Sequence, residues 1–180
     1  MIKKHNFLNA RRLALLAVLM ALCVVGRLAF QFIPNVQPIT TLLILITLNM
    51  TWLDGWIVAI GSMVLTNIFL GMGPWTIAQI IAYSIVILFV ALVKMIVKKS
   101  QINQQSATVI FSLVSFFVGF FYGFIVSILT SFMIGIPNFW IYYFQGVSFD
   151  LMHAIGNFFF YILLAPVMNP LFKKMKQTYF

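Results

Sequence analysis

Acidic residues are nearly absent from this chain of 180 residues, which has two Asp or Glu against eleven Lys or Arg. Charged residues make up 7% of the sequence and hydrophobic residues 63%, whereas an ordinary soluble domain is about 25% charged. A soluble fold of this size could not hide so much apolar surface from water. The sequence therefore predicts an all-α, polytopic membrane protein that forms a single membrane domain, residues 1–180.

Other absences narrow the function. The single cysteine, Cys23, excludes a disulfide framework and a cysteine-based metal site, and its apolar surroundings favour a packing role. There is no G-x-x-x-x-G-K-[ST] phosphate loop, no acidic metal cluster and no soluble domain. An embedded acid–base enzyme built on Asp150 and His153 would need a nucleophile motif, which is missing. We expect no enzymatic activity and no cofactor or metal of the protein's own. The first apolar run is also too long for a cleavable signal peptide.

Hydrophobic runs predict six membrane-spanning helices in a compact bundle. The second and third runs are short and are joined by a tight turn, residues 52–56, in which Asp54 is a turn residue or a helix cap. These two short runs could alternatively form one re-entrant hairpin. A polar cytoplasmic connector, residues 98–107, precedes the last two helices, and a long aromatic loop, residues 135–146, separates them. The predicted helices are 13–32, 39–53, 55–70, 76–97, 108–134 and 147–171.

Basic residues give the orientation of the bundle. With six spans, ten of the eleven fall on one face, which the positive-inside rule assigns to the cytoplasm. Both termini are then cytoplasmic, and the net charge of +9 reflects topology and the anionic leaflet, with no role in nucleic-acid binding. Arg27 alone is expected at the outer end. The other ten are Lys3, Lys4, Arg11, Arg12, Lys94, Lys98, Lys99, Lys173, Lys174 and Lys176.

Polar residues within the spans lie mainly in the outer half of the membrane. Burying a polar side chain in lipid costs free energy, so such residues usually have a function. On the last helix they occupy one face at i, i+3 and i+7. The pattern predicts a polar cup that opens outward and is closed below, which suits capture of a solute better than its conduction. Arg27 could instead reach outer headgroups, and Asp150 with His153 could form a structural hydrogen bond. The candidate residues in this half are Arg27, Asn35, Gln37, Asn67, Gln79, Tyr83, Asp150, His153 and Asn157, with the loop aromatics Trp75 and Tyr143.

Two stripes of small residues predict close helix contacts. Ser115, Gly119, Gly123 and Ser127 recur every four residues, which favours packing inside the bundle. The other stripe, on the first helix, begins at the membrane edge, where a partner subunit is an alternative to internal packing. It comprises Ala10, Ala14, Ala17 and Ala21.

These features together resemble the substrate-binding S component of an energy-coupling-factor (ECF) vitamin transporter. The pair Ala17-x-x-x-Ala21, with Ala14 on the same face, is similar to the AxxxA motif of that family. The resemblance implies docking of these alanines onto a transmembrane T component driven by two ATPase subunits, and toppling of the S component to deliver its vitamin. It also implies a bacterial plasma membrane.

A narrower likeness is to the group that includes the cobalamin S component. It is carried by Gly26-Arg27, by residues 34–40 (PNVQPIT), by residues 67–76 (NIFLGMGPWT) and by Gln79. It implies that cobalamin is the ligand and that the site is shaped by Arg27, Asn35, Gln37, Asn67, Trp75 and Gln79. Other vitamins (riboflavin, pantothenate, folate) and a self-sufficient carrier or channel remain alternatives, as does a purely structural subunit.

Overall fold

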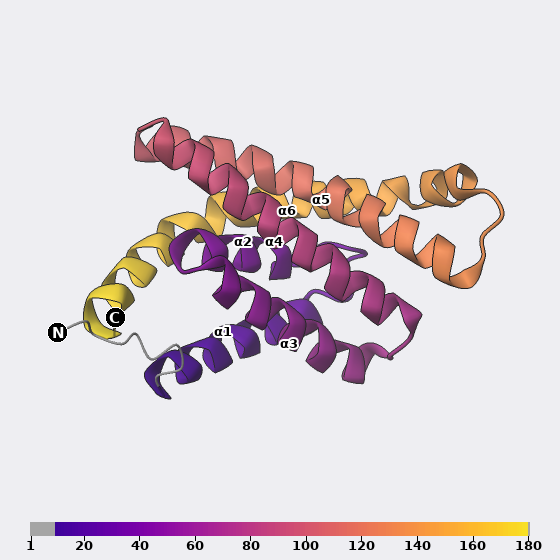
Figure 1. Ribbon diagram of the computed structural model, residues 1–180, viewed down its shortest axis with the longest axis horizontal. Helices are drawn as coiled ribbons and strands as arrows, with labels where there is room; N and C mark the ends of the chain where they lie inside the picture. Colours follow the sequence, from indigo (N-terminus) through magenta and orange to yellow (C-terminus); the bar gives the residue numbers. More distant parts are fainter. Residues whose placement is uncertain (1–9, 180) are drawn as a thin grey trace.

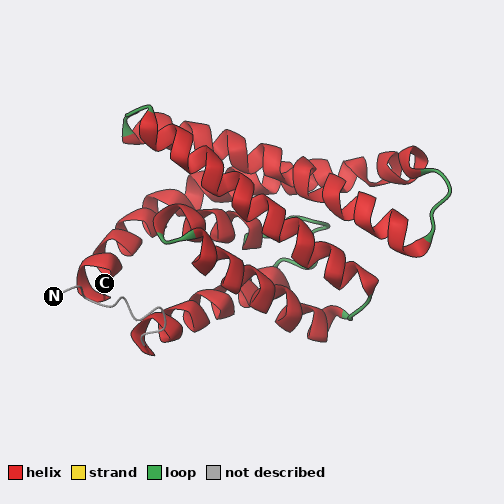
Figure 2. Cartoon of the chain, in the orientation of Figure 1, coloured by secondary structure: helices red, strands yellow, loops and turns green. Residues whose placement is uncertain are grey.

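The computed structural model describes residues 10–179, with side chains through residue 175. Lys3 and Lys4 lie outside the described residues, as does the side chain of Lys176. Helices account for nearly all of the described chain, joined by short loops (Figure 2). They are α1 Ala10–Ala29, α2 Ile39–Asn49, α3 Trp52–Leu70, α4 Pro74–Lys99, α5 Gln104–Ile134 and α6 Phe139–Tyr179.

The six helices form one bundle, consistent with a multi-pass membrane protein. Five of them, all but α2, are long and apolar enough to cross a membrane. The start of α1, the α4–α5 connector and the end of α6 lie toward one end, and the α3–α4 and α5–α6 loops lie toward the other (Figure 1). We call these the lysine end, after Lys94, Lys98 and Lys173, and the opposite end. α5 and α6 form a long hairpin that packs against α4 and α2.

Helix α2 is shorter than predicted and occupies the middle of the bundle. Its 11 residues span about 16 Å, against about 30 Å for the hydrocarbon core. Residues 39–47 are all buried, so α2 is covered by protein on every side. The predicted start of α2 at 39 and end of α3 at 70 are confirmed, but the predicted junction was wrong: α2 ends at Asn49, before 53, and α3 begins at Trp52, before 55, so residues 52–56 form the first turn of α3.

A capping box explains why α3 begins so early. Thr51 Oγ1 accepts from the Asp54 amide at 3.1 Å, and Asp54 Oδ2 accepts from the Thr51 amide at 3.1 Å. Asp54 is therefore a helix cap, as the sequence suggested. Its Oδ1 also accepts from Nη2 and Nε of Arg12 at 2.6 and 2.9 Å, which ties α1 to α3 at the lysine end.

The second half of the loop between α1 and α2, residues 35–38, packs into the bundle, because α2 is too short to reach the opposite end (Figure 1), whereas residues 31, 32 and 34 are exposed. A Cβ atom at Gly26 would lie 2.8 Å from Pro38 Cγ, and one at Gly156 would lie 3.1 Å from Val36 Cγ1. Asn35 Nδ2 donates to the Phe149 carbonyl at 2.8 Å. Non-helical backbone is tolerated at membrane depth where protein covers it. The loop thus packs against α6.

Helix α6 starts earlier than predicted, so the expected loop 135–146 is reduced to residues 135–138. Asn138 starts the helix, since its Oδ1 accepts from the Ile141 amide at 3.2 Å. The ring of Phe139 stacks on Tyr143, and Tyr143 meets Phe124 of α5 edge-on at 5.2 Å, which holds the new first turns in place. The predicted boundaries 147–171 were too short at both ends.

The stripe of small residues on α5 packs inside the bundle, as predicted. Gly119 and Gly123 are buried. A Cβ atom at Gly119 would collide with the backbone of Ala154, and one at Gly123 with the carboxylate of Asp150. The bare glycine surface therefore lets α6 approach α5 closely enough to bury the polar face of α6.

We predict that Gly119→Ala lowers the free energy of unfolding by about 1–3 kcal/mol, because the new methyl group forces the two helices apart. Gly146→Ala is the matched control: a Cβ there meets nothing within 4 Å, so stability stays the same or rises by up to about 1 kcal/mol. Thermal unfolding in a neutral detergent measures both. Equal melting temperatures for the two variants would contradict the close approach.

Candidate functional site

Arg27 lies at the centre of a hydrogen-bond network between α1, α3 and α4. Its Nη1 donates to Thr66 Oγ1 and, at 3.1 Å, to Asn67 Oδ1. Asn67 Nδ2 in turn donates to Thr76 Oγ1 at 3.0 Å and to Gln79 Oε1 at 2.8 Å. We call these five residues the Arg27 network. Arg27 thus turns into the protein, and the alternative in which it reaches outer headgroups is not the arrangement found.

A second network joins α2, α4, α5 and α6. Thr40 Oγ1 is 2.8 Å from Tyr83 Oη and 2.8 Å from His153 Nε2. The ring of Tyr122 contacts both Tyr83 and His153, with centroids 4.5 and 5.4 Å apart. We call these four residues the His153 network. Gln79 and Tyr83 are one helical turn apart on α4, so this helix contributes to both networks.

The predicted polar face of α6 is present and buried. Asp150, His153 and Asn157 are 6%, 4% and 0% exposed. His153 has Thr40 as its partner, in place of the hydrogen bond to Asp150 that the sequence suggested. Asp150 Oδ2, His153 Nδ1 and both side-chain polar atoms of Asn157 have no hydrogen-bond partner within the described part of the chain. Buried polar atoms are nearly always paired, so this face has unused donors and acceptors.

Four predicted site residues belong neither to the two networks nor to the polar face of α6. Asn35 bonds the Phe149 carbonyl, and Gln37 lies half-buried in the same loop. Trp75 is 45% exposed and donates to the Gly71 carbonyl at 3.3 Å. Tyr143 is held among the rings at the start of α6. Trp75 and Tyr143 follow the α3–α4 and α5–α6 loops and so lie toward the opposite end, whereas Asn35 and Gln37 belong to the α1–α2 loop.

The sequence did not single out Thr76, Tyr122 or Ser115 for the site. Ser115 Oγ and Thr41 Oγ1 both donate to the Asn157 carbonyl, at 3.2 and 3.1 Å. Tyr122 directly precedes Gly123 of the α5 stripe. Its position beside the stripe could have indicated that it lies near α6. Thr76 gives no comparable indication, since threonine is common in the first turn of a helix.

The alanines of α1 take no part in the core. Ala10, Ala14, Ala17 and Ala21 are all exposed, whereas the buried residues of this helix are Leu16, Leu19 and Cys23. Cys23 therefore has the packing role predicted for it. The small-residue face of α1 remains available on the outside of the bundle.

Comparison with protein-family models, with curated proteins and with solved structures gave no match to this chain. The described residues contain no group of three or more His, Cys, Asp or Glu side chains that could hold a metal ion. The two networks, the α6 face and the surfaces of the bundle are therefore the features of the molecule that bear on its function.

We predict opposite effects for two Asn→Leu substitutions of similar volume. Asn157→Leu should raise the free energy of unfolding by about 1 kcal/mol, because it removes unpaired buried polar atoms. Asn67→Leu should lower it by about 2 kcal/mol, because Arg27, Thr76 and Gln79 each lose a hydrogen bond to Asn67. Thermal unfolding without added ligand measures both. A loss of stability at Asn157 as large as that at Asn67 would show that the Asn157 side chain is paired.

Proposed function

We propose that this protein is the S component of an ECF-type vitamin transporter in a bacterial plasma membrane. It captures a vitamin, cobalamin being the best candidate, at the opposite end of the bundle. It then delivers the vitamin through a T component and two ATPase subunits. Both termini, with the lysine end, face the cytoplasm in this proposal, as the positive-inside rule suggests.

The observation that supports capture most strongly is the buried polar face of α6 with its unused hydrogen-bonding atoms. Asp150, His153 and Asn157 contribute acceptors and donors that lack partners within the described residues. Unpaired polar groups cost stability unless function requires them. A polar ligand entering from the opposite end would pair with these atoms once the α1–α2 loop moves aside.

Arg27 adds a positive charge to this region. Its hydrogen-bond acceptors in the Arg27 network are neutral oxygens of Thr66 and Asn67. The chain has only two acids, and Asp54 is paired with Arg12 at the lysine end. A ligand with a phosphate or carboxylate group would therefore find a cation on the side of the site that faces α1.

Exposed aromatic rings near the opposite end suit a bulky ligand. Aromatic residues are also enriched at membrane interfaces, where they anchor a protein without binding a ligand. Phe32, Trp75, Trp140 and Phe144 are all largely exposed. Rigid rings give broad apolar contact with little loss of rotamer freedom. Together with the resemblance of three outer segments, this favours cobalamin over riboflavin, pantothenate or folate.

Calorimetric titration of the purified protein with these four vitamins tests the ligand. We expect tight binding of cobalamin, with the other three at least about tenfold weaker. Asn157→Leu and Arg27→Gln should each weaken binding about tenfold, the effect of one lost hydrogen bond to a buried polar or charged group. Lys99→Gln, at the lysine end, is the control with unchanged affinity. Micromolar or weaker binding of all four vitamins would overturn the assignment.

A self-sufficient carrier is the second candidate, and one observation favours it. A groove at the lysine end is lined by Phe111 and Tyr161, which are one helical turn from Ser115 and Asn157 of the polar site. On α2 the separation is longer, because the buried residues 42–47 lie between Thr41 and Leu48, which also lines the groove. The one-turn layer on α5 and α6 that separates the polar site from the groove could open in a carrier.

Uptake experiments separate the two functions and test docking. Replacing both Ala17 and Ala21 with Trp should abolish vitamin uptake in cells but leave binding unchanged, because the bulky rings block a partner from the exposed face of α1. The pair Val18→Trp and Leu22→Trp has the same spacing and also lies at exposed positions, and it should retain uptake. Normal uptake by the alanine variant, or vitamin flux in liposomes that contain this chain alone, would favour the carrier.

A further inference from the structure

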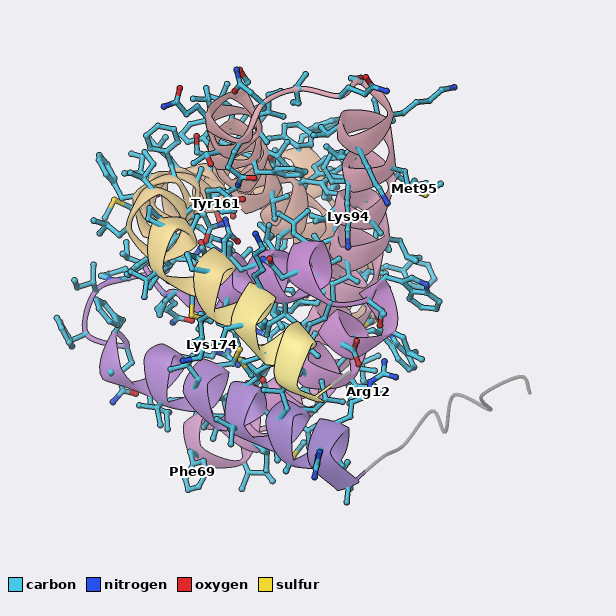
Figure 3. All side chains as sticks on the ribbon, turned by 90° about the vertical axis from the view of Figure 1, so that its left-hand side faces the viewer. Arg12, Phe69, Lys94, Met95, Tyr161 and Lys174 are labelled. Atoms are coloured by element: carbon cyan, nitrogen blue, oxygen red, sulfur yellow. The ribbon has the colours of Figure 1, made fainter. Side chains whose placement is uncertain are left out.

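The lysine end contains a groove that the sequence did not predict. Its volume is about 1000 Å³, and its walls come from α2, α4, the α4–α5 connector, α5 and α6. Figure 3 looks onto this end, with Lys94 on α4 and Tyr161 on α6, and the connector passing from α4 to α5. Pro166 and Pro170 lie inside α6 beside the groove. Proline kinks a helix, and the last part of α6 bends away from α5 (Figure 1).

Positive charge is concentrated on this groove. Lys94, Lys98 and Lys173 line it, and no Asp or Glu is among its lining residues in the described chain. Lys94 Nζ donates to the carbonyls of Thr47 and Met50 at 2.9 and 3.2 Å, which places its ammonium group at the C-terminal end of α2. Lys98 and Lys173 are exposed at the rim. Asp54 is bound to Arg12, and Asp150 lies on the polar face of α6.

The interior of the groove is different from its rim. Val97, Ile102, Phe111 and Ala165 give it apolar walls. Asn49 and Asn169 also line the groove, with Asn49 Nδ2 donating to Asn169 Oδ1 at 2.7 Å. A cationic rim above apolar walls is complementary to an amphiphile with an anionic head. An inorganic anion would use the rim but leave the apolar walls uncovered.

We propose that this groove is a binding site for an acidic phospholipid. The phosphate group lies between Lys98 and Lys173, within reach of Lys94, and an acyl chain lies along Val97 and Phe111. Basic pockets between membrane helices on the cytoplasmic side bind anionic headgroups in this way. The lysines then do more than orient the protein: a bound lipid joins the kinked end of α6 to α4. This site does not depend on the identity of the vitamin.

Native mass spectrometry of the full chain in a neutral detergent tests the proposal, with phosphatidylglycerol as the probe and phosphatidylcholine as the neutral comparison. We expect retention of phosphatidylglycerol, and about 30-fold weaker retention in the double variant Lys98→Gln/Lys173→Gln, the effect of losing two near-surface charges. The matched control, Lys99→Gln/Lys174→Gln, removes the same charge from residues that do not line the groove. It should change retention less than about twofold.

Three outcomes would overturn the proposal. Equal losses in the two double variants would mean that the lipid responds only to net charge. Equal retention of phosphatidylcholine would mean that the lysines do not select the headgroup. Displacement of phosphatidylglycerol by inorganic phosphate at similar concentration would mean that the apolar walls contribute nothing, and that the groove binds free phosphate. Thermal unfolding of each variant checks that the fold is unchanged, which we expect because Lys98 and Lys173 are exposed.

Discussion

The contact between α5 and α6 at Gly119 and Gly123 is the constraint on which the polar site depends. The two glycines leave no side chain between the helices, and Asp150 and Ala154 occupy that space. Asp150, His153 and Asn157 are buried because this contact brings the polar face of α6 against α5. Without hydrophobic association in lipid, such close backbone packing supplies the attraction that offsets the cost of burying polar groups.

The short helix α2 provides the second requirement, a partner for α6 at depth. Because α2 begins inside the bundle, Thr40 reaches His153 and Tyr83. Thr41 reaches the Asn157 carbonyl from the same turn. A longer α2 would extend to the opposite end and would displace the loop that packs on Gly156. The His153 network therefore follows from the length of α2 as well as from side-chain chemistry.

The sequence predicted the helical membrane class and the polar face of α6 because both follow from period and composition. Hydrophobic runs identify helices wherever lipid is the solvent, and the spacing of Asp150, His153 and Asn157 places them on one face. It also predicted internal packing of the α5 stripe, which the burial of Gly119 and Gly123 confirms.

Other features could not be predicted, since they depend on contacts between distant segments. The capping box of Thr51 and Asp54 decides where α3 begins, and residues 52–56 have the composition of a turn. Aromatic stacking decides that residues 139–146 are helical. The groove lies beside Pro166 and Pro170 of α6, and the sequence pattern alone did not show which helices would surround that part of α6. The ligand, the partners and the transport role stay proposals, because the networks fix where polar groups lie and leave open what they bind.

The scarcity of acidic residues links the two ends of the molecule. One carboxylate, that of Asp54, is used to join α1 to α3 through Arg12. Within the described residues, Arg27 donates to neutral oxygens of Thr66 and Asn67, and the lining of the groove holds three lysines and no Asp or Glu. Attraction between opposite charges is strong where the surroundings have a low dielectric constant. In the two proposals, both ends would therefore attract anionic groups from outside the chain, a ligand at the Arg27 end and a lipid headgroup at the lysine end. Arg27 would meet its anion among hydrogen-bonding side chains that can select a particular molecule, whereas the lysines would meet theirs beside apolar walls that suit lipids in general.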